Sequence, residues 1–213
     1  MKRVLGAALM GFMFLALAGC GGGDHAPPPL FKTEILSDPV YDGDIAKDPT
    51  TGFLSVAQGS TQVVSAGIDP ATGVEYRAFL DFPLTGAGGV PSHAIIDSAF
   101  LDIFISSIQT QTAAVTLRID LVDFQPPTLI DTDFYNNAQP ALDTLTVPIF
   151  QSDFDNHVSV DVTPLMVEAQ RLGLIDFQIR ILQGPSADGV VDINDTTGPS
   201  RGLLAPQLQV TYF

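Results

Sequence analysis

The stretch that decides the fold runs from residue 95 to residue 105 and reads IIDSAFLDIFI. Its apolar side chains alternate with the others, so that Ala99, Leu101, Ile103 and Ile105 fall on one face of an extended chain. Successive side chains of a β-strand point to opposite faces of a sheet, and this period of two therefore predicts a strand with one dry and one wetter face.

The same period recurs on both sides of this stretch. We expect further strands at 53–58, 61–67, 74–82, 115–121, 157–162, 174–182 and 207–212. Their polar positions, among them Asp81, Asp120 and Arg180, are expected on the wetter faces. Many short strands, with turn signals between them and almost no helical period, are typical of an antiparallel β-sandwich. The sequence therefore predicts an all-β fold.

The pentapeptide Asp-Pro-x-Thr-Gly occurs twice, at 48–52 and at 69–73. Proline fixes φ for a turn, and glycine supplies the left-handed residue that follows it. Five residues are too few to indicate a duplication, and we expect two turns of one kind.

One short helix is expected near residues 164–172. Thr163 suits the N-cap, Pro164 suits the first helical position, and Gly173 suits the stop. This helix should close one end of the sandwich.

The N-terminus has the pattern of an export signal. Met1-Lys2-Arg3 precedes an apolar run over residues 4–18, which is shorter than the roughly 20 residues that a membrane-spanning helix needs. The run ends in Leu17-Ala18-Gly19-Cys20, which resembles the bacterial lipobox, where the chain is cut before an acylated cysteine. We expect a signal peptide over 1–19 and a lipid anchor on Cys20.

The next residues resemble a tether. Glycines at 21–23 and prolines at 27–29 indicate a segment over 20–33 that is flexible at first and stiffer at its far end. The folded domain is then expected over 34–213, in the cell envelope and outside the cytoplasm. Gly21, not Asp, follows Cys20, which in a bacterium with two membranes resembles sorting to the outer membrane.

The mature chain is strongly acidic. It carries 24 acids against 7 bases, a net charge of −17, which argues against nucleic acid as a partner and against electrostatic docking on anionic lipid. Cys20 is the only cysteine, so a disulfide is excluded and a hydrophobic core must provide the stability.

Three ordered stretches together carry a family resemblance. They are RAFLDF at 77–82 with IIDSAFLDIF at 95–104, VSVDVTPLMV at 158–167, and APQLQVTY at 205–212. Their order and spacing resemble DNRLRE-type domains, relatives of a jelly-roll carbohydrate-binding family on secreted bacterial proteins. The resemblance spans about residues 34–213 and implies a jelly-roll-like antiparallel sandwich.

Sugar binding needs an aromatic platform beside polar groups, and the chain has no Trp. The run Phe134-Tyr135-Asn136-Asn137 is the most suggestive segment, because an aromatic pair among amides suits hydroxyl recognition. Tyr41 is a second candidate. The alternative is that these aromatic residues anchor a loop to the core.

Two acidic clusters stand near the two ends of the domain, and they raise the question of a metal. The first contains Asp42 and Asp44, and the second contains Asp188 and Asp192. Ca²⁺ takes six to eight oxygen ligands from carboxylates and carbonyls. The clusters are either one shared structural Ca²⁺ site or solvated Asp-rich turns, and no cofactor is required.

Residues suited to catalysis are few. The three histidines are His25, His93 and His157, and neither a nucleophile elbow nor a phosphate-binding loop is visible. His157 stands among acids and is either a functional base or an exposed strand residue. We therefore expect a non-catalytic binding module on a lipid anchor, with glycan as the ligand class. The alternative is a structural or assembly subunit that binds other envelope proteins, and an enzyme acting on polysaccharide is the least favoured reading.

Overall fold

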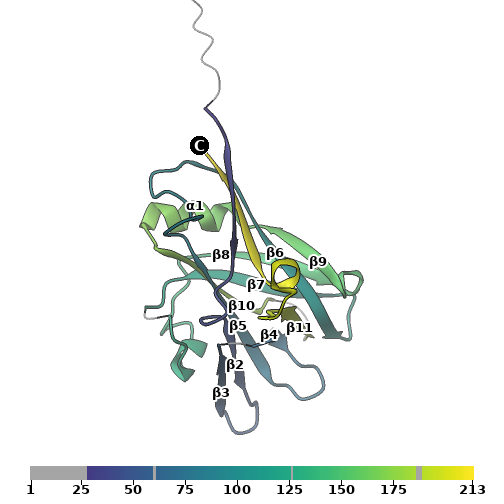
Figure 1. Cartoon of the computed structure of the whole chain (residues 1–213). Helices are drawn as coiled ribbons and strands as arrows, with labels where there is room; N and C mark the ends of the chain where they lie inside the picture. Colours follow the sequence, from purple (N-terminus) through teal and green to yellow (C-terminus); the bar gives the residue numbers. More distant parts are fainter. Residues whose placement is uncertain (1–27, 60, 126, 186–188) are drawn as a thin grey trace, which may run out of the picture.

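The computed structural model describes residues 28–59, 61–125, 127–185 and 189–213. These residues form an all-β fold, as expected, in which one twelve-stranded antiparallel sheet curls into a sandwich-like shape (Figure 1). The strands are β1 (Phe31–Leu36), β2 (Gly43–Lys47), β3 (Leu54–Gln58), β4 (Val63–Ile68), β5 (Glu75–Pro83), β6 (Ile96–Thr110), β7 (Ala114–Val122), β8 (Asp143–Phe150), β9 (Asn156–Asp161), β10 (Asp176–Gln183), β11 (Gly189–Asn194) and β12 (Gln207–Tyr212). The helical segments are α1 (Thr163–Leu172), α2 (Arg201–Leu204), η1 (Asp131–Phe134) and η2 (Gln151–Asp153).

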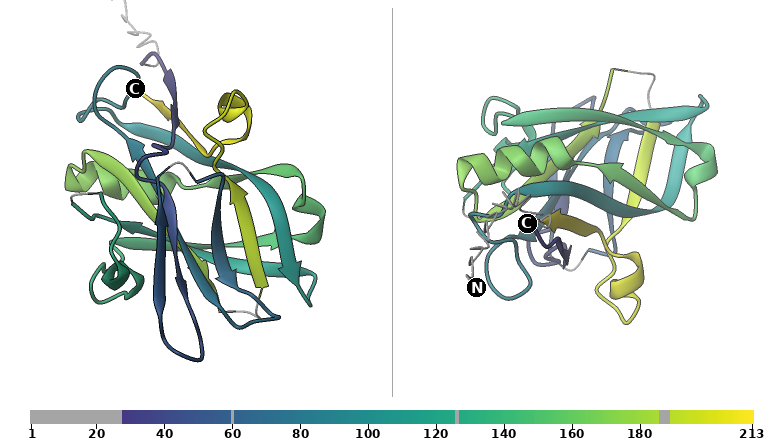
Figure 2. Two further views of the ribbon diagram at one scale, coloured as in Figure 1. Left: turned by 60° about the horizontal axis from the view of Figure 1, so that its bottom comes forward. Right: turned by 90° about the horizontal axis from the view of Figure 1, so that it is seen from above.

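Strand β6, which contains residues 96–105 of the alternating stretch IIDSAFLDIFI, joins the two layers. Its first half pairs with β12 on one edge and with β9 on the other. Its second half pairs with β11, from which the sheet continues through β4, β5, β10, β7 and β8. The long strand therefore belongs to both layers, and the sheet curls around it (Figure 2).

The core lies between the layers, and the alternation in β6 explains it. Ala99, Leu101, Ile103 and Ile105 are all buried and belong to one apolar cluster with the inner residues of the other strands. Helix α1 packs against β6 and β8 at one end of the sandwich, as predicted (Figure 2).

The helix itself is confirmed, but its predicted N-cap is wrong. Thr163 is the first helical residue, and its hydroxyl donates to the carbonyl oxygen of Ala99 instead of capping. Val162 is the N-cap and makes no side-chain cap bond, and the first helical N–H, that of Thr163, donates to the Asp161 carboxylate at 2.9 Å. Gly173 ends the helix with φ of 70°, as expected.

The two ends of the domain meet. Strand β1 pairs with β12 over its whole length, so residues 31–33, which the sequence placed in the tether, belong to the sheet. After β1 the chain crosses to the other layer, where the Asp38 N–H donates to the carbonyl oxygen of Asp81. This crossing places Asp42 at a corner between the layers.

Both Asp-Pro-x-Thr-Gly segments form the same turn. In each, the aspartate accepts backbone hydrogen bonds from residues two or three positions later. These bonds lower the pKa of Asp48, and the Thr72 hydroxyl, with the Ala71 N–H, lowers that of Asp69. The glycines adopt φ of 70° at Gly52 and 74° at Gly73. The prediction of two turns of one kind is confirmed.

The expectation of a wet outer face is wrong for β5, β7 and β10. Asp81, Asp120, Gln178 and Arg180 are all buried. The reason is that residues 123–125 and 127–142, between β7 and β8, fold back over the outer face of these strands. Polar side chains that alternation assigned to water therefore bind one another and the covering segment.

Candidate functional site

Residues 123–125 and 127–142 form a covering loop with a small apolar core of its own. Phe124, Leu129 and Phe134 pack on Phe79 and Ile45 of the sheet, apart from the main core. The rings of Phe79 and Phe124 meet edge to face, with centroids 5.8 Å apart. The covering loop is thus held by apolar contacts beneath it and by two arginines beside it.

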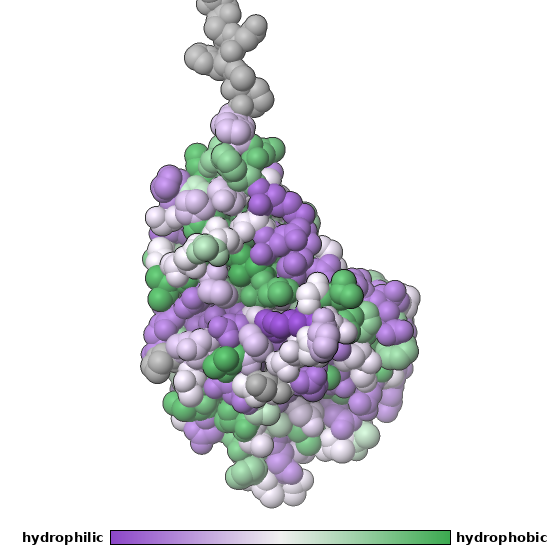
Figure 3. Space-filling view, viewed as in Figure 1, coloured by the Kyte–Doolittle hydropathy of each residue, from purple (hydrophilic) through white to green (hydrophobic). Residues whose placement is uncertain are grey.

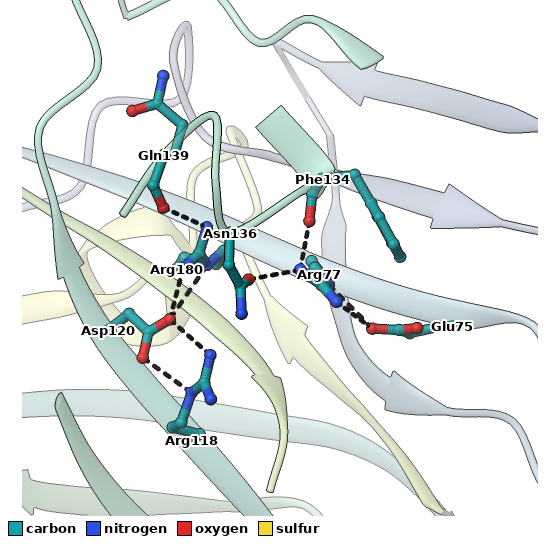
Figure 4. Close-up of polar contacts among 8 residues, drawn as sticks. All are labelled: Glu75, Arg77, Arg118, Asp120, Phe134, Asn136, Gln139 and Arg180. Atoms are coloured by element: carbon teal, nitrogen blue, oxygen red, sulfur yellow. Dashed lines mark hydrogen bonds and ion pairs between the residues drawn. The ribbon is translucent and has the colours of Figure 1, made fainter. Parts of the chain in front are cut away.

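Arg180 of β10 is the first of these arginines, and its side chain is fully buried. Its Nη2 donates to Asp120 Oδ2 at 2.6 Å, and its Nη1 donates to the carbonyl oxygen of Gln139 in the covering loop at 2.9 Å (Figure 4). Asp120 also pairs with Arg118, whose Nε lies 2.9 Å from Oδ1. Burial lowers the pKa of Arg180, and the bond to Asp120 opposes that shift.

Arg77 of β5 is the second. Its guanidinium carbon lies 4.0 Å from the centre of the Phe134 ring, within the range of a cation–π contact. Its Nη1 donates to the Phe134 carbonyl oxygen and, at 2.8 Å, to Asn136 Oδ1 (Figure 4). Glu75 Oε1 accepts from its Nε and Nη2, which leaves the guanidinium fixed between strand and loop.

The structure places the predicted ligand residues of this loop in two different settings. Phe134 is 1% exposed and is an anchor, and the Oδ1 of Asn136 is taken by Arg77. Tyr135 is 42% exposed and Asn137 is also exposed. The Tyr135 ring rests edge to face on Phe134, with centroids 5.6 Å apart. We call Tyr135 and Asn137, together with Lys47, the Tyr135 platform.

Lys47 of β2 supplies the positive charge of the platform. Its Nζ lies 5.7 Å from the centre of the Tyr135 ring and 5.4 Å from that of Phe134. A rigid phenol ring with an ammonium and amides around it combines an apolar surface with several hydrogen-bond donors.

Tyr41, the other predicted platform residue, is half-buried. Its carbonyl oxygen accepts from Gln58 Nε2, which also donates to the carbonyl oxygen of Pro127 in the covering loop. Gln58 Oε1 accepts from the Leu129 N–H at 2.9 Å. Tyr41 is therefore tied to the loop through its backbone and Gln58.

The acidic clusters meet at two places, and the first is the corner where the chain changes layers. Asp42 and Asp195 are both buried and interact directly, and Asp42 Oδ1 accepts from the Asp81 N–H at 2.8 Å. Burial and the facing Asp195 raise the pKa of Asp42 to about 9. Three buried side-chain oxygens gather here, Ser37 Oγ, Asp42 Oδ2 and Asp195 Oδ1, and Arg201 Nη1 lies 3.8 Å from the last of them.

The second place joins Asp44 of β2 to Asp192 of β11. Ser65 bridges them, because its N–H donates to Asp44 Oδ2 at 2.9 Å and its hydroxyl donates to Asp192 Oδ1 at 2.8 Å. Burial, with a further contribution from Asp192, raises the pKa of Asp44 to about 6. The fourth predicted metal residue, Asp188, lies outside the described residues, as does Cys20.

His157 pairs with an acid that the sequence did not single out. Its Nδ1 lies 2.5 Å from Asp102 Oδ1 on the outer face of β6 and β9, and its ring meets Phe104 edge to face. None of the bonds that the structure shows for His157 joins it to an acid that is near it in sequence. The side chain is half-exposed and the pair lies on an open strand face.

Comparison with known proteins adds no family: no protein-family model matches the chain, and no curated protein matches it. Within residues 28–59, 61–125, 127–185 and 189–213, no helix has the length and apolarity to cross a membrane. In the same part of the chain no three His, Cys, Asp or Glu side chains gather as a metal site would require.

Sequence reasoning missed the residues that hold the platform in place. Arg77, Gln58 and Arg180 look like ordinary outward positions of strands. One signal was present for Arg180, which stands between Ile179 and Ile181 in a run with few other charges. A lone arginine in such a run indicates a buried ion pair as readily as a solvated face.

Proposed function

We propose that this chain is a lipid-anchored protein of the bacterial cell envelope that displays a non-catalytic β-sandwich, and that its module binds glycan at the Tyr135 platform. The observation that carries the binding proposal is the construction of the covering loop. Arg77, Arg180 and Phe134 fix its backbone, while Tyr135 remains 42% exposed at its surface. A loop that is fixed in this way loses little conformational entropy when a ligand binds.

The chemistry of the platform suits a sugar. The face of a pyranose ring is apolar and packs on an aromatic ring, whereas its hydroxyls need donors and acceptors at the edge. Tyr135 supplies the ring, and Asn137 and Lys47 supply polar groups beside it. Tyrosine also carries few rotatable bonds, which lowers the entropic cost of the contact.

A polysaccharide pull-down and glycan-array screen tests the binding proposal. The wild-type chain is compared with Tyr135→Ala and with Phe154→Ala, a matched control that removes a 54% exposed aromatic ring from the turn before β9. We expect a specific hit that Tyr135→Ala loses and Phe154→Ala keeps. The absence of any hit, or loss in both variants alike, contradicts the proposal.

The anchor is tested separately on Cys20. Metabolic labelling with a radioactive fatty acid should label the wild-type chain and leave Cys20→Ser unlabelled. The supporting sequence is the lipobox-like run LAGC after a short apolar segment. Equal labelling of both chains, or of neither, contradicts lipidation at this position.

A structural Ca²⁺ ion is a further part of the proposal, and the corner of Asp42 and Asp195 suits it better than the Ser65 bridge. The corner gathers three buried side-chain oxygens, those of Ser37, Asp42 and Asp195, whereas Ser65 already binds Asp44 and Asp192. When bound, the ion would offset the charge of both buried carboxylates. Thermal unfolding at pH 8 after chelator stripping should then shift upward on adding Ca²⁺, and Asp195→Asn should remove the shift. If Ca²⁺ does not raise the unfolding temperature of the wild type, the metal proposal is wrong, and the two carboxylates share a proton instead.

The second candidate is a structural subunit that contacts other envelope proteins. It is favoured by apolar exposure beside the edge strand β8, where Phe150 is 48% and Phe154 is 54% exposed. An edge strand also has backbone groups free to pair with another chain. Cross-linking in intact cells that captures one envelope protein, lost on Phe150→Ser, supports this candidate over the first.

A further inference from the structure

The end of the domain where β1 begins carries exposed apolar side chains. We call this group the β1-end rim, and its members are Leu30 (61% exposed), Phe31 (53%), Ile95 (60%), Val167 (47%) and Phe213 (38%). Figure 3 shows hydrophobic atoms gathered at this end of the molecule. The opposite end is formed by the β2–β3 hairpin (Figure 1).

The rim is continuous. Phe31 stacks on Tyr212 with ring centroids 5.9 Å apart, and Tyr212 precedes Phe213. Phe213 and Ile95 exchange two backbone hydrogen bonds, of 2.9 Å and 3.1 Å. Ile95 and Val167 then border one shallow hollow between the start of β6 and α1. Three distant parts of the chain therefore meet in one apolar surface.

Two ion pairs lie beside the rim. Lys32 binds Glu34 at 2.8 Å, and Arg171 binds Glu168 at 2.6 Å. Asp97 is the exposed acid that remains close to Ile95 in sequence. With a net charge of −15 over the full chain, the protein has placed an apolar and nearly neutral surface at this end.

The chain that precedes Pro28 joins the domain at the rim, and this position indicates what the rim faces. Cys20, the proposed lipid-bearing residue, lies eight residues before Pro28, the first described residue. Eight residues span at most ~29 Å when fully extended. A lipid on Cys20 would therefore hold a bilayer within reach of the rim and raise its effective concentration there.

We propose that the β1-end rim docks on the surface of a neutral phospholipid bilayer, with its apolar side chains at the boundary between headgroups and acyl chains. This inference rests on the proposed lipid anchor. Lys32 and Arg171, the basic residues beside the rim, are both paired with acids, and docking by apolar insertion agrees with the acidity of the chain, which disfavours anionic lipid. The Tyr135 platform is not part of the rim. Docking of the rim would therefore fix how the platform is oriented relative to the membrane.

The chain lacks Trp, and a single introduced Trp is therefore an unambiguous reporter. The lipidated full-length chain is reconstituted in phosphatidylcholine–phosphatidylethanolamine vesicles with or without brominated phosphatidylcholine, a quencher located among the acyl chains. Ile95→Trp and Phe213→Trp report on the rim, and both positions are far in sequence from the tether. Phe53→Trp, at a 69% exposed position in the β2–β3 turn, is the control.

Docking predicts that Trp emission at positions 95 and 213 shifts to the blue and loses most of its intensity with brominated lipid, while emission at position 53 does not change. Flotation of the same vesicles reports on the anchor independently. A chain that floats while emission from all three positions stays alike overturns docking alone. A chain that does not float overturns the anchor and docking together. A blue shift at 95 that depends on protein concentration and needs no vesicles overturns docking in favour of self-association.

Discussion

Arg180→Met tests whether the buried pair with Asp120 holds the covering loop in place. The substitution keeps most of the side-chain volume and removes the charge, so the Asp120 carboxylate, fully buried, loses its partners at 2.6 Å and 3.2 Å. The Gln139 carbonyl oxygen loses its donor at the same time. Both effects should reduce the stability of the fold and of the loop.

The magnitude follows from burial. Removing one member of a buried ion pair costs about 3–5 kcal/mol, because the other charge is left without compensation. Arg118 still pairs with Asp120 at 2.9 Å, which places the expectation at the lower end, about 3 kcal/mol. For a domain of this size that corresponds to a fall in Tm of roughly 6–12 °C.

The assay is equilibrium unfolding in urea followed by circular dichroism, with hydrogen exchange measured over residues 131–139. Arg118→Met is the matched control, because its side chain is 32% exposed and its loss should cost about 1 kcal/mol or less. The double variant Arg180→Met with Asp120→Leu removes the orphaned carboxylate and should recover most of the loss. Equal costs for Arg180→Met and Arg118→Met, or unchanged exchange in the loop, would refute this reasoning.

Three other predictions follow from burial and backbone geometry. The folded-state pKa of Asp42 is raised to about 9, so the stability that its protonated form contributes is present at acidic pH and is lost as pH rises toward that value. In the presence of a chelator, Tm should therefore fall between pH 5 and pH 9. Asp42→Asn, which mimics the protonated acid beside Asp195, should flatten this dependence of Tm on pH. Phe134→Ala should cost about 3–5 kcal/mol in urea unfolding, unlike the loss of an exposed ring, because Phe134 is 1% exposed in the small core beneath the loop. Gly67→Ala should prevent stable folding, judged by soluble yield and circular dichroism, because a Cβ there would lie 2.1 Å from the Gly189 carbonyl oxygen at φ of +116°.

Alternation predicted most of the strands, including β5, β7 and β10, although it assigned the covered outer faces of these three to water. It missed strands whose pattern is interrupted or whose partner is distant in sequence. Strand β8 contains Pro148 and is an edge strand, which tolerates a missing N–H, but the proline hid its pattern. The first half of β1, residues 31–33, was expected in the tether. Its place in the sheet could not be predicted locally, because its partner β12 lies at the far end of the chain.

The candidate site was predictable in its residue types and not in its construction. The aromatic and amide run at 134–137 drew attention to the covering loop. Phe134 is buried as an anchor would be, whereas Tyr135 is exposed and its part in sugar binding stays a prediction. The supports, Arg77 and Arg180, lie on strands distant in sequence from the loop. No local pattern reveals that a loop will fold over them, because that contact is set by tertiary packing.

The measurement that tests the central claim most directly is the dissociation constant of wild type and Tyr135→Ala for the polysaccharide that the screen selects, by calorimetry. A central tyrosine in a binding site typically contributes enough that its removal weakens binding about tenfold or more. The account predicts that loss, with Tm changed by little, since Tyr135 is 42% exposed. An unchanged dissociation constant in Tyr135→Ala, at unchanged Tm, would contradict the assignment of the Tyr135 platform as the binding surface.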